Sequence, residues 1–177
     1  MKVLAFAGYS GAGKTTLIEQ LIARLRAAGQ RVSVLKHARH GFDIDQPGKD
    51  TWRHRSAGAF EVVVASAQRL ALLREFEREL ELSVHTLIAE FYPGVDWLLV
   101  EGWRDSDLQK IEVWRAATGQ PVRYAHDDFI TAVATDSAAL LPTPTGLPVL
   151  DLNDAGAVLD WMLAQGDRFE YQPELYT

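Results

Sequence analysis

The residues with the clearest chemical meaning form the string Gly8-Tyr9-Ser10-Gly11-Ala12-Gly13-Lys14-Thr15 near the N-terminus. The string fits G-x-x-x-x-G-K-[ST], the pattern of a loop that binds the phosphates of a nucleotide. Glycines at these positions let successive backbone N–H groups point at one anion. We therefore expect Lys14 to reach the β- and γ-phosphates of a nucleoside triphosphate and the Thr15 hydroxyl to coordinate Mg²⁺.

The elements on either side of this string are those that a phosphate loop requires. The apolar run at 3–7 predicts a buried parallel strand, and the apolar stripe along 14–28 predicts a helix. The positive end of that helix dipole adds to the attraction for phosphate. The residues expected to contact the phosphates are Gly8, Ser10, Gly11, Ala12, Gly13, Lys14, Thr15 and Thr16.

A candidate metal partner follows the apolar run at 98–100. In phosphate-loop proteins an acidic residue at the end of a neighbouring strand holds the Mg²⁺ shell, and Glu101 ends the strand predicted at 96–102. Asp96 is the rival acid, but it begins that strand, whereas ligands of open α/β sheets bind at the carboxyl ends. We expect Thr15 and Glu101 to serve the metal ion, and Gly102 to let the backbone pass close to the γ-phosphate.

The segment 36–55 is the third candidate, because it is locally basic in a chain of net charge −6. It carries five lysines and arginines against three aspartates, which suits an anionic ligand. Its carboxylates are candidates to meet Mg²⁺ or orient water, and its arginines to balance charge on the γ-phosphate. His37 and His40 are candidate transition-metal ligands. The charged candidates are Asp43, Asp45, Lys49, Asp50, Arg53 and Arg55.

Four segments together resemble the MobB family of molybdopterin-guanine dinucleotide biosynthesis adapter proteins. They are the phosphate loop, the stretch 36–59 with the pattern K-H-x-x-H-x-F-D-x-D-x-x-G-K-D-[ST]-x-R-x-R-x-A-G-A, the L-V-E-G string at 99–102 and the K-I-E-V string at 110–113. The matching blocks lie within roughly residues 1–115, and the long pattern is the most specific of them.

The resemblance implies a homodimeric GTP-binding protein that hydrolyses GTP weakly at best. It also implies a role beside molybdopterin guanylyltransferase, the enzyme that joins GMP to molybdopterin. Carried over by position, the charged candidates of 36–55 line a switch-like loop over the nucleotide. The candidate catalytic residues are Lys14, Glu101, Asp43 and Arg53.

Base recognition departs from the usual GTPase pattern, because the string [NT]-K-x-D does not occur in this chain. The nearest substitute is Thr135-Asp136, at the end of the strand predicted at 130–134. A carboxylate can accept both the N1–H and the N2–H of guanine, which adenine does not offer. Asp136 is therefore the candidate guanine reader, and an ordinary turn residue is the alternative.

The remaining periodicities predict an α/β fold with a mostly parallel sheet flanked by helices, the phosphate-loop NTPase fold. Further strands are expected at 31–37, 60–66, 110–114 and 149–150, and further helices at 49–57, 83–91 and from Asn153 or Asp154 to 165. The apolar run 69–74 either pairs with 60–66 as a hairpin or begins a helix. The charged stretch 75–82 is predicted as a solvated helix face. We expect one domain over 1–177, with 166–177 as a C-terminal tail that its aromatic residues can dock.

Composition excludes several classes of protein. The chain has no cysteine, so disulfides, thiolate metal sites and cysteine nucleophiles are absent. Its sequence pI of about 5.3 argues against a general nucleic-acid binder. No apolar stretch approaches the ~18 residues of a membrane span, and the run after Lys2 is too short for a signal peptide. We expect a cytoplasmic protein that does not bind membranes.

Two alternatives to a GTP-binding adapter stay open on sequence grounds. A small-molecule kinase using ATP or GTP would need arginines over the phosphates and a base for an acceptor hydroxyl, roles that Arg53, Arg55 and Asp43 could fill. However, the chain has no evident lid insertion. A metal-chaperone GTPase would rely on His37 and His40, without any cysteine ligand.

Overall fold

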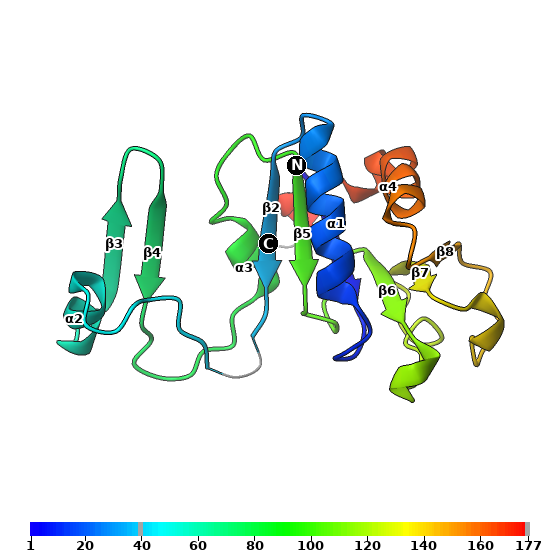
Figure 1. Ribbon diagram of the computed structural model, residues 1–177, viewed down its shortest axis with the longest axis horizontal. Helices are drawn as coiled ribbons and strands as arrows, with labels where there is room; N and C mark the ends of the chain where they lie inside the picture. The colour runs from blue at the N-terminus through cyan, green and yellow to red at the C-terminus, as the bar shows by residue number, and fades with distance from the viewer. Residues whose placement is uncertain (39–40, 176–177) are drawn as a thin grey trace. The chain divides into compact units, whose positions relative to one another are not determined.

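The computed structural model describes residues 1–38 and 41–175, and the chain forms two compact units (Figure 1). The larger unit comprises Met1–His37 and Val84–Thr177, and the smaller unit comprises Ala38–Ser83. The prediction that residues 1–177 form one domain stays a prediction.

The larger unit is built on a six-stranded sheet in which every neighbouring pair is parallel. This confirms the predicted mostly parallel α/β sheet. The order β2-β5-β1-β6-β7-β8 places the strand before the phosphate loop between β5 and β6. The strands are β1 (Lys2–Ala7), β2 (Val32–Lys36), β5 (Trp97–Glu101), β6 (Lys110–Trp114), β7 (Ile130–Thr135) and β8 (Val149–Asp151).

Side chains alternate between the two faces of the sheet along each buried strand, so both faces carry apolar side chains. Helices cover both faces. On one face Leu4 and Phe6 of β1 join a core with helices α1 (Lys14–Ala27) and α4 (Ala155–Ala164), which pack together. On the other face Val3 and Ala5 pack in a smaller core with α3 (Val84–Ile88). No helix in the described part of the chain is long and apolar enough to span a bilayer.

The ends of the long helices follow the sequence closely. Helix α1 begins at Lys14 and ends one residue before the predicted limit of 28. Helix α4 is capped by Asp154, whose carboxylate accepts from the backbone N–H groups of Gly156 and Ala157, so Asp154 rather than Asn153 is the cap. Short 3₁₀ turns are Ala116–Thr118, Ala138–Leu140, Gly166–Phe169 and Pro173–Leu175.

The C-terminal segment docks on the larger unit over its described residues. Phe169 is 2% exposed and packs against Trp97 and Trp161. Glu170 forms ion pairs with Lys2 and with the N-terminal ammonium group. The predicted docking of this segment by aromatic side chains is confirmed for Phe169.

The described residues of the smaller unit form one helix and one hairpin. Helix α2 (Asp50–Ser56) precedes β3 (Glu61–Ala65) and β4 (Leu70–Arg74), which pair antiparallel, so the hairpin alternative is the one adopted (Figure 1). The helix predicted over 75–82 is wrong. There the Glu75 N–H donates to the Phe60 carbonyl and extends the hairpin pairing, and the rest of the stretch is irregular. Helix α3 is also shorter than the predicted 83–91.

Candidate functional site

The phosphate loop joins β1 to α1 with a backbone that only glycine can follow at its first position. Gly8 has φ +136°, and a Cβ there would lie 2.2 Å from the carbonyl oxygen of Val113 in β6. Gly13, the residue before α1, has φ +101°. Packing and backbone conformation therefore both require glycine at Gly8, and backbone conformation favours it at Gly13, in addition to any ligand.

Lys14 lies across this loop. Its Nζ donates to the carbonyl oxygens of Gly8 and Tyr9, both at 2.9 Å. Around it Ser10, Gly11, Thr15 and Thr16 are exposed, whereas Ala12 is buried. The ammonium group is thus held at the loop by neutral carbonyls, which are weaker partners than anionic phosphate oxygens.

The two predicted metal partners lie in direct contact. Parallel pairing aligns Phe6 with Glu101, so the end of β5 lies beside the start of the phosphate loop. The Thr15 hydroxyl donates to Oε1 of Glu101 at 2.8 Å, and the Lys36 ammonium lies 2.9 Å from the same oxygen. The Glu101 side chain is only 11% exposed. A hydroxyl and a carboxylate are oxygen donors of the kind that Mg²⁺ prefers, so these residues fit that ion.

Gly102 and Trp103 bring the end of β5 against the end of β2. Gly102 has φ +108°, and a Cβ there would lie 2.6 Å from the Cβ of His37. The backbone N–H of His37 donates to the Glu101 carbonyl oxygen. The centroid of the His37 ring lies 4.7 Å from the centroid of the Trp103 ring. His40 lies outside the described residues. Within residues 1–38 and 41–175, no three His, Asp or Glu side chains gather so as to hold a metal ion.

Arg115 is a residue of this site that the sequence reasoning missed. It follows β6 directly, and its Nε donates to the carbonyl oxygen of Ala12 in the phosphate loop at 3.1 Å. One terminal nitrogen of the same guanidinium donates to the Asp136 carboxylate at 2.8 Å. The candidate base reader is therefore linked to the phosphate loop through one side chain. The available signal was position, since Arg115, like Glu101 and Asp136, stands at the carboxyl end of a core strand.

The two charged residues of the K-I-E-V string are fully buried in β6 and hold the connection that follows. Lys110 donates to the Asp127 carboxylate, and Glu112 accepts from the backbone N–H groups of Arg123 and Tyr124. Burial lowers the pKa of Lys110 and raises the pKa of Glu112. These contacts fix the path of the chain between β6 and β7.

In the smaller unit, Arg55 is the centre of a cluster of carboxylates. One terminal nitrogen of its guanidinium lies 3.0 Å from Asp43 and 3.2 Å from Asp45, and its Nε lies 2.7 Å from Glu75. The Thr51 hydroxyl donates to Asp45 at 2.7 Å. The Arg55 side chain is 16% exposed and that of Asp45 is 8% exposed. Three of the predicted charged residues are thus brought together with one another.

The other charged candidates of this unit face solvent. Lys49 is exposed, and Asp50 and Arg53 form only a 3.9 Å pair one helical turn apart, with side chains 89% and 71% exposed. Such a pair contributes little to stability. The kinase alternative assigns Arg55 to the phosphates and Asp43 to an acceptor hydroxyl, but these two side chains bond to each other.

Contacts within the cluster lower the pKa values of its two aspartates. The pKa of Asp43 is lowered by the N–H of Asp45 and then by the Arg55 guanidinium, and the pKa of Asp45 is lowered by the Thr51 hydroxyl. A folded-state pKa below the ordinary value stabilises the folded form above that value, and the stabilisation is lost as the pH falls through the lowered pKa. The cluster therefore holds the loop before α2 most firmly at neutral pH.

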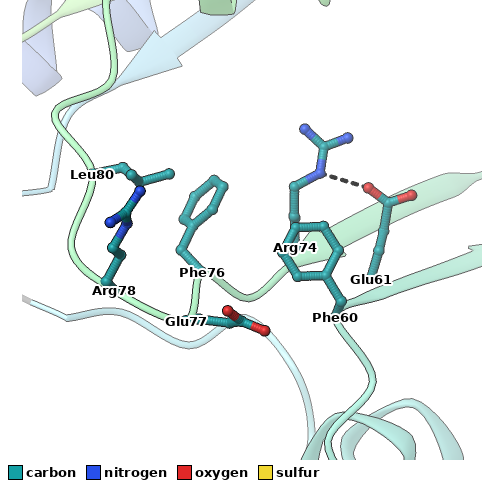
Figure 2. A pocket seen from close by; sticks show the side chains of 7 residues that line it. All are labelled: Phe60, Glu61, Arg74, Phe76, Glu77, Arg78 and Leu80. Atoms are coloured by element: carbon teal, nitrogen blue, oxygen red, sulfur yellow. Dashed lines mark hydrogen bonds and ion pairs between the residues drawn. The ribbon is translucent and has the colours of Figure 1, made fainter.

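A hollow of about 480 Å³ lies within the smaller unit, beside the hairpin (Figure 2). Phe60, Phe76 and Leu80 give it apolar walls. Arg74 forms an ion pair with Glu61 across the hairpin. None of the predicted site residues lines it. Its lining residues are Phe60, Glu61, Arg74, Phe76, Glu77, Arg78 and Leu80.

Replacing Arg55 by Gln should release the carboxylates of the cluster. We expect the carboxyl pKa values of Asp43 and Asp45 to rise toward the ordinary 3.8, because the variant lacks the cation that favours their ionised forms. Titration followed by carboxyl-carbon NMR measures this directly. Arg53→Gln, on the same helix and exposed, is the matched control and should leave both values in place. Unchanged values in Arg55→Gln would contradict the described cluster.

The chain is similar in sequence to proteins of one known family. Residues 3–136 match the family model for molybdopterin guanine dinucleotide synthesis protein B, MobB. The chain is 40% identical to the molybdopterin-guanine dinucleotide biosynthesis adapter protein of Escherichia coli (strain K12), over 92% of this chain and 94% of the relative. It is 35% identical to the protein of the same name from Haemophilus influenzae, over 90% and 86% of the two chains.

The fold is also that of a solved relative. The crystal structure of a MobB homologue from Bacillus stearothermophilus is 24% identical and superposes with a TM-score of 0.71, covering 95% of this chain and 99% of that one. The family model includes the phosphate loop, Glu101 and the hairpin unit, and the two relatives each match at least 90% of this chain. This chain therefore belongs to the MobB family.

Proposed function

We propose that this chain is a GTP-binding adapter protein of molybdenum cofactor biosynthesis that acts beside molybdopterin guanylyltransferase. The cofactor pathway is supported by the names of the two relatives, which cover nearly the whole chain. Nucleotide binding is supported by the loop around Lys14. The observation that carries the proposal is the contact of Thr15 with Glu101, since it joins a phosphate-loop hydroxyl to a carboxylate where a Mg²⁺–triphosphate complex would bind.

In this proposal the chain binds phosphate through the N–H groups of the loop and the Lys14 ammonium, while Thr15 and Glu101 hold Mg²⁺. The bound ion would neutralise charge on the β- and γ-phosphates. Lys36 lies on the same Glu101 oxygen and competes with a metal ion there. Because β2 ends at Lys36, this competition links nucleotide binding to the segment that leads into the smaller unit.

Hydrolysis by this site should be slow. Efficient phosphoryl transfer to water requires a residue that positions the attacking water and an arginine that stabilises charge in the transition state. Asp43 and Arg55 are engaged with each other, and Arg53 is exposed on α2. In this proposal nucleotide binding acts by changing the conformation of the 36–55 segment, and GTP hydrolysis is secondary.

Calorimetry with GTP and ATP, with and without Mg²⁺, tests nucleotide binding. We expect GTP to bind about tenfold or more tightly than ATP, because guanine offers two donors to a carboxylate and adenine does not. Mg²⁺ should strengthen GTP binding in the native chain and much less in Glu101→Gln, whereas the exposed control Glu19→Gln should keep the full effect. Equal GTP and ATP affinities, or turnover above ~1 s⁻¹ without partners, would contradict the proposal.

Asp136→Asn tests the base reader. The amide presents a donor where the carboxylate accepts, so GTP binding should weaken while xanthosine triphosphate, which has a 2-oxo group, gains relative affinity. A change of about tenfold or more in the ratio of the two dissociation constants is expected. Asp128→Asn, exposed on the loop before β7, is the control. GTP affinity equal to that of the native chain in Asp136→Asn would remove Asp136 from base recognition.

The proposal includes a homodimer formed through the hairpin. An isolated two-stranded hairpin is only marginally stable, and among the described residues β3 and β4 pair as strands only with each other. Here Val63 and Leu72, which pair across the hairpin, are 55% and 45% exposed, and Leu70 is 68% exposed. So much exposed apolar surface on one small element favours burial against a second copy of the chain.

Sedimentation equilibrium tests the dimer. The native chain should sediment with twice the monomer mass at micromolar concentration, and Leu72→Lys should shift the equilibrium toward the monomer by burying a charge in the apolar contact. Leu163→Lys is the matched control, since Leu163 is 47% exposed on α4 of the larger unit. A native chain that stays monomeric at tens of micromolar, or a dimer unaffected by Leu72→Lys, would rule out the hairpin contact.

A further inference from the structure

We infer that Arg115 is a positioning residue for guanine selection: its guanidinium fixes the Asp136 carboxylate relative to the phosphate loop. The inference rests on the proposed function, in which Asp136 reads the base. In the usual [NT]-K-x-D string a lysine and a carboxylate lie two residues apart. In this chain the cation, Arg115, and the carboxylate, Asp136, would follow two different strands.

The sheet topology brings the two residues together. Strands β6 and β7 are parallel neighbours, and their register pairs Trp114 with Thr135. Arg115 directly follows Trp114, and Asp136 directly follows Thr135. Both residues therefore lie at the same edge of the sheet as the phosphate loop. Since β7 lies two strands from β1, about 10 Å at the usual strand spacing, Asp136 stands at a distance suited to the base when the phosphates occupy the loop.

The guanidinium touches the loop as well as the carboxylate. Nε donates to the Ala12 carbonyl, and a Cβ built on Gly13 would lie 3.4 Å from Nε and 3.6 Å from a terminal nitrogen. Arg115 therefore lies against Gly13, the residue before α1. Its planar fork holds two acceptors in a fixed relation, which a single ammonium group on a flexible stem does not.

The contacts leave Asp136 able to accept from a base. Arg115 donates to Oδ2, and in the described part of the chain no hydrogen bond reaches Oδ1. Each carboxylate oxygen can accept more than one hydrogen bond, so both oxygens can serve guanine N1–H and N2–H while Oδ2 keeps the arginine. The Arg115 and Asp136 side chains are 31% and 28% exposed, so a ligand can reach them.

The experiment compares GTP, inosine triphosphate and inorganic tripolyphosphate by calorimetry in the native chain and in Arg115→Gln. Inosine triphosphate lacks the 2-amino group, and tripolyphosphate lacks the base. We expect Arg115→Gln to reduce GTP affinity about tenfold or more, to reduce the preference for GTP over inosine triphosphate, and to leave tripolyphosphate affinity within about twofold. Arg115→Lys should restore GTP affinity only in part, since one ammonium cannot replace the fork.

A double-mutant cycle with Asp136→Asn separates positioning from a general loss of structure. If Arg115 acts through Asp136, the GTP losses of Arg115→Gln and Asp136→Asn are not additive, and the double variant is little weaker than Asp136→Asn alone. Thermal unfolding of each variant without nucleotide checks the fold, and Arg26→Gln, at an exposed arginine on α1 of the same unit, is the control.

Four results would overturn the inference. An equal loss for tripolyphosphate and GTP would place Arg115 on the phosphates, and additive losses in the cycle would separate it from Asp136. An unchanged GTP preference in Arg115→Gln, with the native chain preferring GTP, would refute the inference alone. A native chain with no preference for GTP would refute both the inference and guanine recognition in the proposed function.

Discussion

The parallel pairing of β1 with β5 and β6 is the constraint on which the candidate site depends. A parallel sheet brings the carboxyl ends of all its strands to one edge, and the order β2-β5-β1-β6-β7-β8 places the phosphate loop in the middle of that edge. Glu101 and Arg115, which both lie far from the loop in the sequence, reach it from its two sides. Any change in the order or register of these strands would separate them.

The electrostatics of the larger unit follow from this arrangement. A single oxygen of Glu101 accepts a hydrogen bond from the Thr15 hydroxyl and lies 2.9 Å from the Lys36 ammonium, so a largely buried carboxylate has both a hydrogen-bond donor and a cation beside it. On the other side of the loop, Arg115 joins a backbone carbonyl to Asp136. The site thus has a carboxylate suited to a metal ion on one flank and a carboxylate suited to a base on the other.

The charged and apolar side chains of the smaller unit are arranged differently. Several of its ion pairs converge on Arg55, which contacts Asp43, Asp45 and Glu75 at once. The unit's apolar side chains lie largely at the surface of the hairpin and around the hollow of Figure 2. The exposed apolar side chains of the hairpin are the feature on which the proposed dimer rests.

The sequence was sufficient for the features that depend on local pattern. The phosphate loop, α1 and the buried strand before Glu101 follow from motif and apolar periodicity, and the parallel sheet follows from the alternation of strands and helices. The helix expected at 75–82 was wrong because charge spacing says little where no apolar stripe exists to bury. Arg115 was missed because its role depends on the pairing of β6 with β7 and on the loop 103 residues earlier. The contact of Arg55 with Asp43 depends on loop geometry, which spacing alone does not fix.

The most direct test of the account is a crystal structure of the chain with Mg²⁺ and a non-hydrolysable GTP analogue. The account predicts phosphates within the loop around Lys14, the metal ion beside Thr15 and Glu101, and the guanine edge on Asp136 with Arg115 still bonded to that carboxylate. A guanine ring bound away from the carboxyl end of β7, or a metal ion far from Glu101, would contradict it.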